Sequence, residues 1–167
     1  MKRILFLCFL VPAISAIGQN ALAPDKVHVT ADLISEHHDP AKSADEVVVK
    51  TIKLSLENHS NQDINDATVR VVFYANELPK NSIVVEKKLE KQVSLAGRKN
   101  AVVVMDAVTF KFTPSHGESV KGRRGKSSSK RVAASGHRYA GYSIEIIESG
   151  KVVGWGFSAK QFDPTVK

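Results

Sequence analysis

The sequence predicts an all-β protein, an antiparallel immunoglobulin-like β-sandwich of about seven strands with one long basic loop. Three observations lead to this fold class. Apolar and polar residues alternate with a period of two along most of the chain after residue 25, as they do in half-buried strands. No stretch of ten or more residues has helical periodicity. Regularly spaced strands in a chain of 167 residues with one Cys are typical of such a sandwich, and a small barrel is the alternative.

The alternating runs give the strands in order. The expected strands cover residues 26–35, 47–57, 67–75, 83–95, 100–113, 142–148 and 153–157. In each of the first three runs, apolar residues such as Val29, Leu54 and Val71 gather on one face, and this face should line the core. The fourth run has a helix-forming composition around Lys88, but its apolar residues recur with the period of a strand. We therefore predict a strand there.

The fifth run, 100–113, differs from the others because it is apolar on both faces between Val102 and Met105. Continuous apolar residues are typical of a strand that is buried on both faces. We therefore expect this strand to be central in its sheet.

The last two runs predict a β-hairpin. Ser149 and Gly150 lie between them, and Gly adopts positive φ values in a tight turn without steric cost. Gly154 and Gly156 flank Trp155, which favours a bulge or a close approach of a neighbouring segment at this strand.

The N-terminal segment predicts export. Residues 1–18 contain two early basic residues, an apolar run to Ile14 and then small residues, which is the pattern of a signal peptide. The apolar run is short for a membrane span, and an uncleaved anchor is the alternative. We expect cleavage after Gly18, or alternatively after Ala16. The mature chain should be periplasmic or secreted, free of Cys and without a transmembrane segment.

After a short lead (19–25), we expect a single sandwich domain at 26–162 and a C-terminal tail at 163–167. Within the domain, 114–136 is rich in Gly and Ser and lacks apolar alternation, which predicts a flexible loop. This loop carries six cations, our candidate binding residues Lys121, Arg123, Arg124, Lys126, Lys130 and Arg131. Loss of two basic residues with the signal lowers the formal net charge from +7 to +5, so the mature chain outside 121–131 sums to −1.

Sequence motifs do not indicate an enzyme. The segment around Gly125 resembles a phosphate loop, but Val120 stands where the first Gly is required. His37 and His38 are adjacent, so on an extended chain they point to opposite faces and cannot easily share a metal ion. No Gly-x-Ser-x-Gly nucleophile motif occurs. We predict no catalytic residue, no metal ligand and no cofactor.

Part of the chain, residues 52–104, resembles the small bacterial envelope β-sandwich domains of the FxLYD type. The matching features are Leu54 and Leu56 before Asn58-His59-Ser60, the alternating Val69-x-Val71-x-Phe73-Tyr74, and the later Ser94-Leu95-Ala96-Gly97. The sequence departs from the family at Ala75, where those domains tend to have Asp. The resemblance implies an extracytoplasmic binding or accessory domain and transfers no site residues.

These observations give three functional hypotheses. The first is an exported, non-enzymatic binding or accessory module of a bacterial envelope, whose basic loop contacts an acidic glycan, lipopolysaccharide or another anionic surface. The absence of aromatic residues in the loop argues against specific nucleic-acid recognition. The second is a structural subunit that docks to an envelope protein through an edge strand such as 67–75. The third is a secreted hydrolase acting on glycans.

Overall fold

The computed structural model describes residues 26–38, 45–121 and 127–166. Its strands are β1 (Val27–His38), β2 (Glu46–Asn58), β3 (Ile64–Leu78), β4 (Ser82–Leu95), β5 (Asn100–Val104), β6 (Val108–Thr113), β7 (His116–Lys121), β8 (Ser127–Val132), β9 (Ser135–Glu148) and β10 (Lys151–Phe157). One short 3-10 helix, η1 (Lys160–Phe162), follows them. Among the described residues, no helix has the length and hydropathy that a membrane-spanning segment needs.

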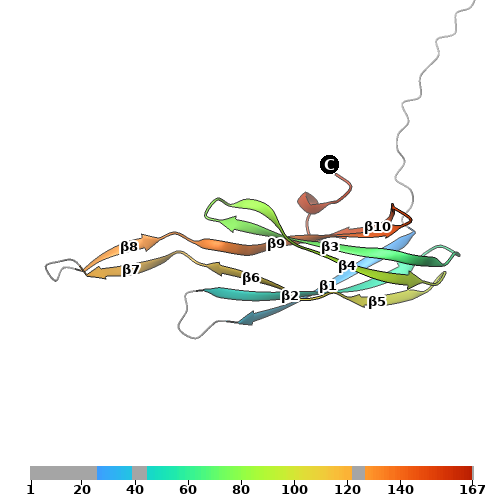
Figure 1. The fold of residues 1–167 in the computed structure, drawn as a ribbon, viewed down its shortest axis with the longest axis horizontal. Helices are drawn as coiled ribbons and strands as arrows, with labels where there is room; N and C mark the ends of the chain where they lie inside the picture. Colours follow the sequence, from blue (N-terminus) through green and yellow to red (C-terminus); the bar gives the residue numbers. More distant parts are fainter. Residues whose placement is uncertain (1–25, 39–44, 122–126, 167) are drawn as a thin grey trace, which may run out of the picture.

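Two layers of antiparallel strands face each other, which confirms the predicted all-β, sandwich-like fold (Figure 1). One layer contains β1, β2, β5 and β6, and the other has the order β4-β3-β9-β10. The layers are joined where β6 pairs briefly with β9, through Phe112 opposite Gly136 and Thr113 opposite Ser135. Hydrogen bonding therefore runs continuously from one layer into the other at a single end of the molecule.

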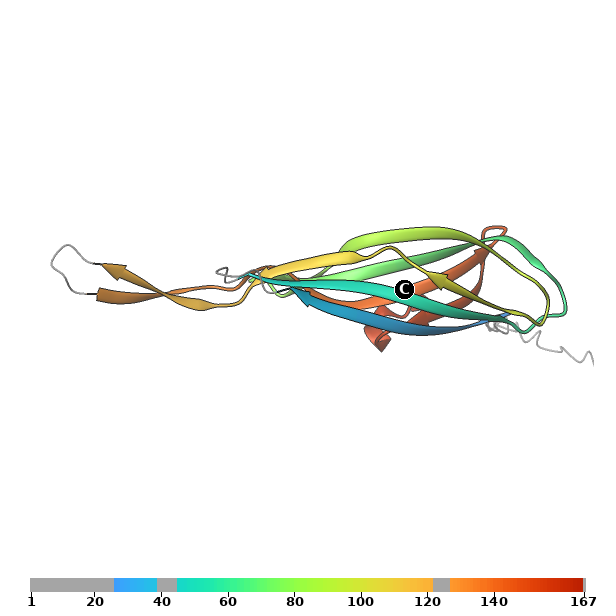
Figure 2. The same ribbon diagram turned by 90° about the horizontal axis from the view of Figure 1, so that it is seen from below.

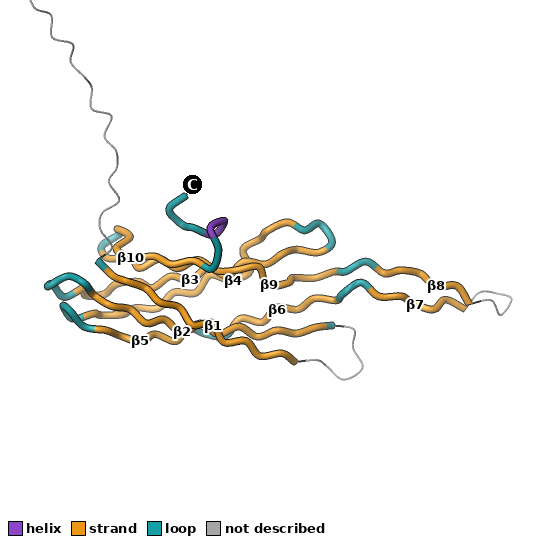
Figure 3. The backbone as a smooth tube through the Cα atoms, turned by 180° about the vertical axis from the view of Figure 1, so that it is seen from behind, coloured by secondary structure: helices purple, strands orange, loops and turns teal. Residues whose placement is uncertain are grey.

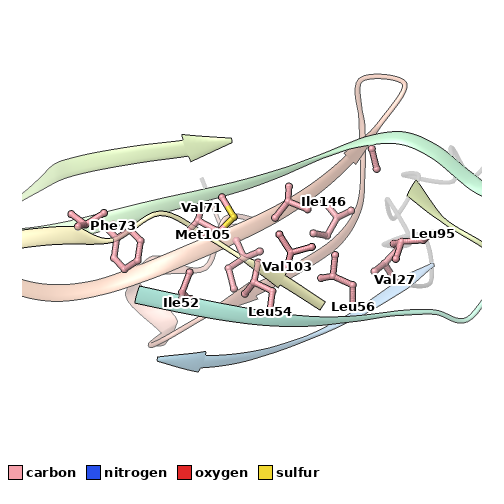
Figure 4. Close-up of a cluster of buried hydrophobic side chains, with 14 of the residues drawn as sticks. Val27, Ile52, Leu54, Leu56, Val71, Phe73, Leu95, Val103, Met105 and Ile146 are labelled. Atoms are coloured by element: carbon pink, nitrogen blue, oxygen red, sulfur yellow. The ribbon is translucent and has the colours of Figure 1, made fainter. Parts of the chain in front are cut away.

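The core lies between the layers and is built by the alternation that the sequence shows. Ile52, Leu54 and Leu56 of β2 are fully buried and face the other layer. The opposing layer contributes the buried residues Val69, Val71, Phe73, Ile144 and Ile146, and Figure 4 shows part of this cluster. In β2 and β3 every second side chain is buried over most of the strand, and the alternate positions of these strands are partly or fully exposed.

The fifth predicted strand is divided, and the prediction of a central position is wrong for its first half. A break at residues 105–107 separates β5 from β6, and both pair with β2. Since β5 has no other strand partner among the described residues, it lies at an edge. Val102 and Val104 are 60% and 48% exposed, so only one face of β5 is buried.

The prediction that the candidate docking strand 67–75 lies at an edge is wrong. It belongs to β3, which pairs with β4 on one side and β9 on the other. Its backbone hydrogen-bonding groups are therefore already engaged on both sides, and strand addition cannot occur there.

The predicted C-terminal hairpin and the strand at 83–95 are confirmed. Ser149 and Gly150 have φ values of 49° and 77° and connect β9 to β10. The close approach expected beside Trp155 is present at Gly154, where a Cβ would lie 2.4 Å from the carbonyl oxygen of Val27. The sequence with helix-forming composition is the 14-residue strand β4.

The sequence predicts a flexible loop at 114–136, but this prediction is wrong for much of the segment. It contains β7 and β8, which pair with each other from His116 opposite Val132 to Lys121 opposite Ser127. These two strands extend beyond the layers in continuation of β6 and β9 (Figures 1 and 2). We call residues 116–132 the arm. Because the arm residues of known exposure, 116–119 and 129–132, are accessible to solvent on both faces, they lack the apolar alternation by which a sequence reveals a strand.

Candidate functional site

The arm holds the residues that the sequence singles out as a binding site, but the structure describes only part of them. Lys130 and Arg131 lie on β8, and both are exposed. Lys121 is the last residue of β7. Arg123, Arg124 and Lys126 lie outside the described residues. The structure therefore places three of the six candidates on one two-stranded hairpin.

The register of the arm places Lys130 and Arg131 on opposite faces. Arg131 is opposite Gly117, and one step further along the same face Ser129 is opposite Ser119. We call these four residues the Arg131 face. Lys130 is opposite Glu118, and this side also carries His116 and Val132. We call these four residues the Glu118 face, in which His116 Nε2 lies 3.5 Å from Glu118 Oε1.

A groove of about 520 Å³ lies on the outer face of the second layer. Val72, Tyr74 and Ile83 form part of its apolar surface, and charged groups border it. Its lining is completed by Arg70, Lys88, Ser143, Glu145, Gln161, Phe162, Asp163, Pro164 and Val166. The two cations are matched by two carboxylates, so the groove has no excess charge with which to attract an ion.

Arg70 links three strands at one end of this groove. Its Nε donates to Glu90 Oε1 on β4 at 2.8 Å, and its Nη1 donates to Glu145 Oε2 on β9 at 3.0 Å. Hydrogen bonds from Arg70 and then Lys88 lower the pKa of Glu90, while the bond to Glu90 raises the pKa of Arg70 against the opposing effect of burial. Both partners of Arg70 are carboxylates on neighbouring strands, so these two ion pairs connect β3 to β4 and to β9.

The groove is closed on one side by the chain after β10, a feature that sequence reasoning missed. Phe162 is 5% exposed and stacks on Tyr74, with ring centroids 4.7 Å apart and planes at 19°. A Cβ at Gly141 would lie 2.2 Å from Phe162 Cε2, so the ring fills the space above this glycine. Figure 3 shows this C-terminal segment on the outer side of the β3–β9–β10 layer. The contact joins distant parts of the sequence, and no periodic pattern signals it.

Two tyrosines of β9 lie near the core. Burial, and then the nearby Tyr142, raise the pKa of Tyr139 to about 12. A weaker opposing effect comes from the nearby Ser158 hydroxyl, which does not reach hydrogen-bond geometry with Tyr139 and instead accepts the Tyr142 N–H at 2.9 Å. The buried Tyr139 hydroxyl has no hydrogen-bond partner among the described residues. Lys50 Nζ lies 4.8 Å from the centre of the Tyr139 ring, a favourable cation–π arrangement.

Histidines are spread over the molecule. His37 and His38 end β1, opposite Val48 and Val47. His137 Nδ1 lies 2.6 Å from Glu86 Oε2. Within the described ranges, no three His, Cys, Asp or Glu side chains converge as metal ligands would.

The residues that carry the family resemblance have a structural role. Asn58 is 1% exposed, and its Nδ2 donates to the carbonyl oxygens of Gln62, Leu95 and Ala96 at 2.8, 3.2 and 3.3 Å. Its Oδ1 accepts hydrogen bonds from the N–H and hydroxyl of Ser60. Asn58 thus ties the β2–β3 loop to the β4–β5 turn.

Comparison with known proteins identifies no relative from which a function could be transferred. No family model matches the chain, and no curated protein matches it. A similar solved structure is described as the X-ray structure of Northeast Structural Genomics Consortium target SoR45, with 8% sequence identity and a TM-score of 0.34. The match covers 65% of this chain and 83% of that one. A likeness at this level supports no argument about family or function.

Proposed function

We propose that this protein is an exported, non-enzymatic binding or accessory module of a bacterial envelope that contacts an anionic polymer or surface through its arm. One observation carries the proposal. The six cations of residues 121–131 exceed the net charge of the mature chain. The three described ones, Lys121, Lys130 and Arg131, lie on a hairpin that extends beyond the sandwich (Figure 2). A flexible polyanion can reach a projecting hairpin from several sides, and release of its counterions favours binding.

The classification of the sandwich is part of this proposal. A layer of order β4-β3-β9-β10 facing β1, β2, β5 and β6 is compatible with an immunoglobulin-like arrangement. The resemblance of residues 52–104 to FxLYD-type domains supports the same assignment and an extracytoplasmic role.

The proposed export rests on residues 1–18, which lie outside the described residues. Expression in a bacterial host followed by mass spectrometry of the periplasmic fraction tests it. We expect a mature chain that begins at Gln19. Recovery of the uncleaved chain from the membrane fraction would contradict it.

The test of binding compares three proteins on acidic glycans and lipopolysaccharide across a salt series. The first is the mature wild type, and the second has all six arm cations replaced by Ser. The third is a control with six exposed cations of the sandwich replaced by Ser, namely Lys53, Lys87, Lys99, Arg138, Lys151 and Lys160. We expect binding that weakens with salt in the wild type and the control and is lost in the arm variant. Equal losses in the two variants would refute a role for the arm, because only net charge would then matter.

A second candidate function is docking to an envelope protein by strand addition. The exposed large apolar side chains on described strands all lie on strands with an open edge: Ile34, Ile83, Val85, Val102, Val104, Val152 and Phe157. Apolar residues on open edges favour pairing with another chain. Binding that persists in high salt and is lost in Val85→Lys or Val102→Lys would support this function over the first.

A further inference from the structure

We propose that the arm binds an acidic polysaccharide through the Arg131 face and not through the Glu118 face. This inference rests on the proposed function and goes beyond it by naming the face and the class of polymer. It uses only residues 116–119 and 129–132 of the arm, whose side chains the structure describes.

The two faces differ in charge although they are carried by the same short hairpin. On the Arg131 face, Arg131 is directly opposite Gly117 and shares the face with Ser119 and Ser129, and no carboxylate is among these four residues. On the Glu118 face, the cation Lys130 is directly opposite a carboxylate. A polyanion approaching this second face meets Glu118 together with Lys130, and the repulsion offsets the attraction.

The shape of the Arg131 face suits a chain of sugar rings. Gly117 has no side chain, and a Cβ there would meet nothing within 4 Å. The serines add only hydroxyl groups, which both donate and accept hydrogen bonds as sugar hydroxyls do. The planar guanidinium of Arg131 can bind a carboxylate with two parallel hydrogen bonds. The face therefore offers a low surface with hydroxyls and one carboxylate-binding group.

Two other classes of polyanion fit this face less well. Single-stranded nucleic acids bind through aromatic platforms, and the Arg131 face has no aromatic side chain. Lipid surfaces hold peripheral segments by inserting apolar side chains, and the Arg131 face has none. Both classes would have to bind through charge alone.

The test uses two neighbouring substitutions that remove the same charge from opposite faces, Arg131→Ser and Lys130→Ser. Both residues are exposed, so neither change should alter folding, and circular dichroism verifies this. The probe is polygalacturonate, a carboxylate polymer, measured by calorimetry at low and moderate salt. We expect Arg131→Ser to weaken binding about tenfold and Lys130→Ser by less than about threefold through loss of one long-range charge.

Single-stranded DNA and phosphatidylglycerol vesicles are measured beside polygalacturonate. Tighter binding of either one, with a similar loss in both variants, would overturn the polysaccharide assignment. Equal weakening toward polygalacturonate would overturn the choice of face while leaving the arm as the binding element. Absence of wild-type binding to every probe and to lipopolysaccharide would overturn the proposed function itself, and this result differs from the other two, in which the wild type binds.

Discussion

At the scale of single residues, Asn58 fixes the geometry of one end of the sandwich. Replacing it by Ala would leave the carbonyl oxygen of Leu95, which Asn58 Nδ2 contacts in a buried position, without this partner. We expect Asn58→Ala to lower the free energy of unfolding by about 2–3 kcal/mol, since an unsatisfied buried polar group is costly. Urea denaturation measures this change.

The matched control is Asn61→Ala in the same loop. Its Oδ1 accepts a hydrogen bond from Arg98 Nε at 2.8 Å in an exposed position, so the loss should stay below about 1 kcal/mol. Equal effects of the two substitutions would show that Asn58 does not tie the loops together.

Tyr139 gives a prediction about alkaline pH. The folded pKa of about 12 lies above the ordinary value of 10.0, so the folded state holds its proton at pH values where the unfolded state releases it. The free energy of unfolding should therefore fall as pH rises from about 10 to about 12. Tyr139→Phe should make this fall shallower, with Tyr142, whose pKa burial also raises, accounting for a remaining part.

The same substitution is informative at neutral pH. Because the Tyr139 hydroxyl has no partner among the described residues, Tyr139→Phe should change stability by less than about 1 kcal/mol. Tyr74→Phe is the comparison. It should lower the free energy of unfolding more than Tyr139→Phe does, because the Tyr74 hydroxyl lies 3.2 Å from Ser143 Oγ and this hydrogen bond would be lost. If the free energy of unfolding of Tyr139→Phe fell between about pH 10 and about pH 12 as steeply as that of the wild type, Tyr139 would not be the source of the alkaline effect.

At the scale of elements, the buried ring of Phe162 packs the C-terminal segment against the sandwich. The Phe162 ring stacks on Tyr74 and fills the space above Gly141. Phe162→Ala should lower the free energy of unfolding by about 3 kcal/mol, as removal of a buried aromatic side chain does, and should expose the segment to proteases. Gln161→Ala, at the exposed neighbouring position, should do neither. Similar protease sensitivity of the two variants would argue against an anchoring role for Phe162.

The strands of the sandwich could be predicted from the sequence because each buries one face. β1, β2, β3 and β4 match the predicted runs to within a few residues at each end. The apolar pattern could not reveal the break between β5 and β6, because Val102 and Val104 face solvent at an edge. Sequence alone does not show which strands lack a neighbour, so it also could not show that 67–75 is paired on both sides.

The candidate site could be predicted only in part for a related reason. The concentration of cations at 121–131 is visible in the sequence. The division of Lys130 and Arg131 between two faces depends on the pairing of β7 with β8, which leaves no apolar signal. The position of Phe162 on Tyr74 depends on a long-range contact, which a local pattern does not encode.

At the scale of the whole molecule, charge and packing are separated. The sandwich contains the buried core, and its acidic and basic residues nearly balance, whereas residues 121–131 carry six cations and no acidic residue. An isolated two-stranded hairpin contributes little to stability, so the arm should be dispensable for folding. Because of this separation, a binding element outside the core can change without loss of the fold.

Excision of the arm tests whether binding and folding are separate. Thr113 and Ser135 are directly opposite each other, so a two-residue Asn-Gly turn can join them in place of residues 114–134. In urea denaturation, the free energy of unfolding of the shortened chain should equal that of the wild type to within about 1 kcal/mol. The shortened chain should show no salt-dependent binding to the acidic glycans and lipopolysaccharide. A folded, shortened protein that binds these polyanions as tightly as the wild type would show that the arm is not the binding element.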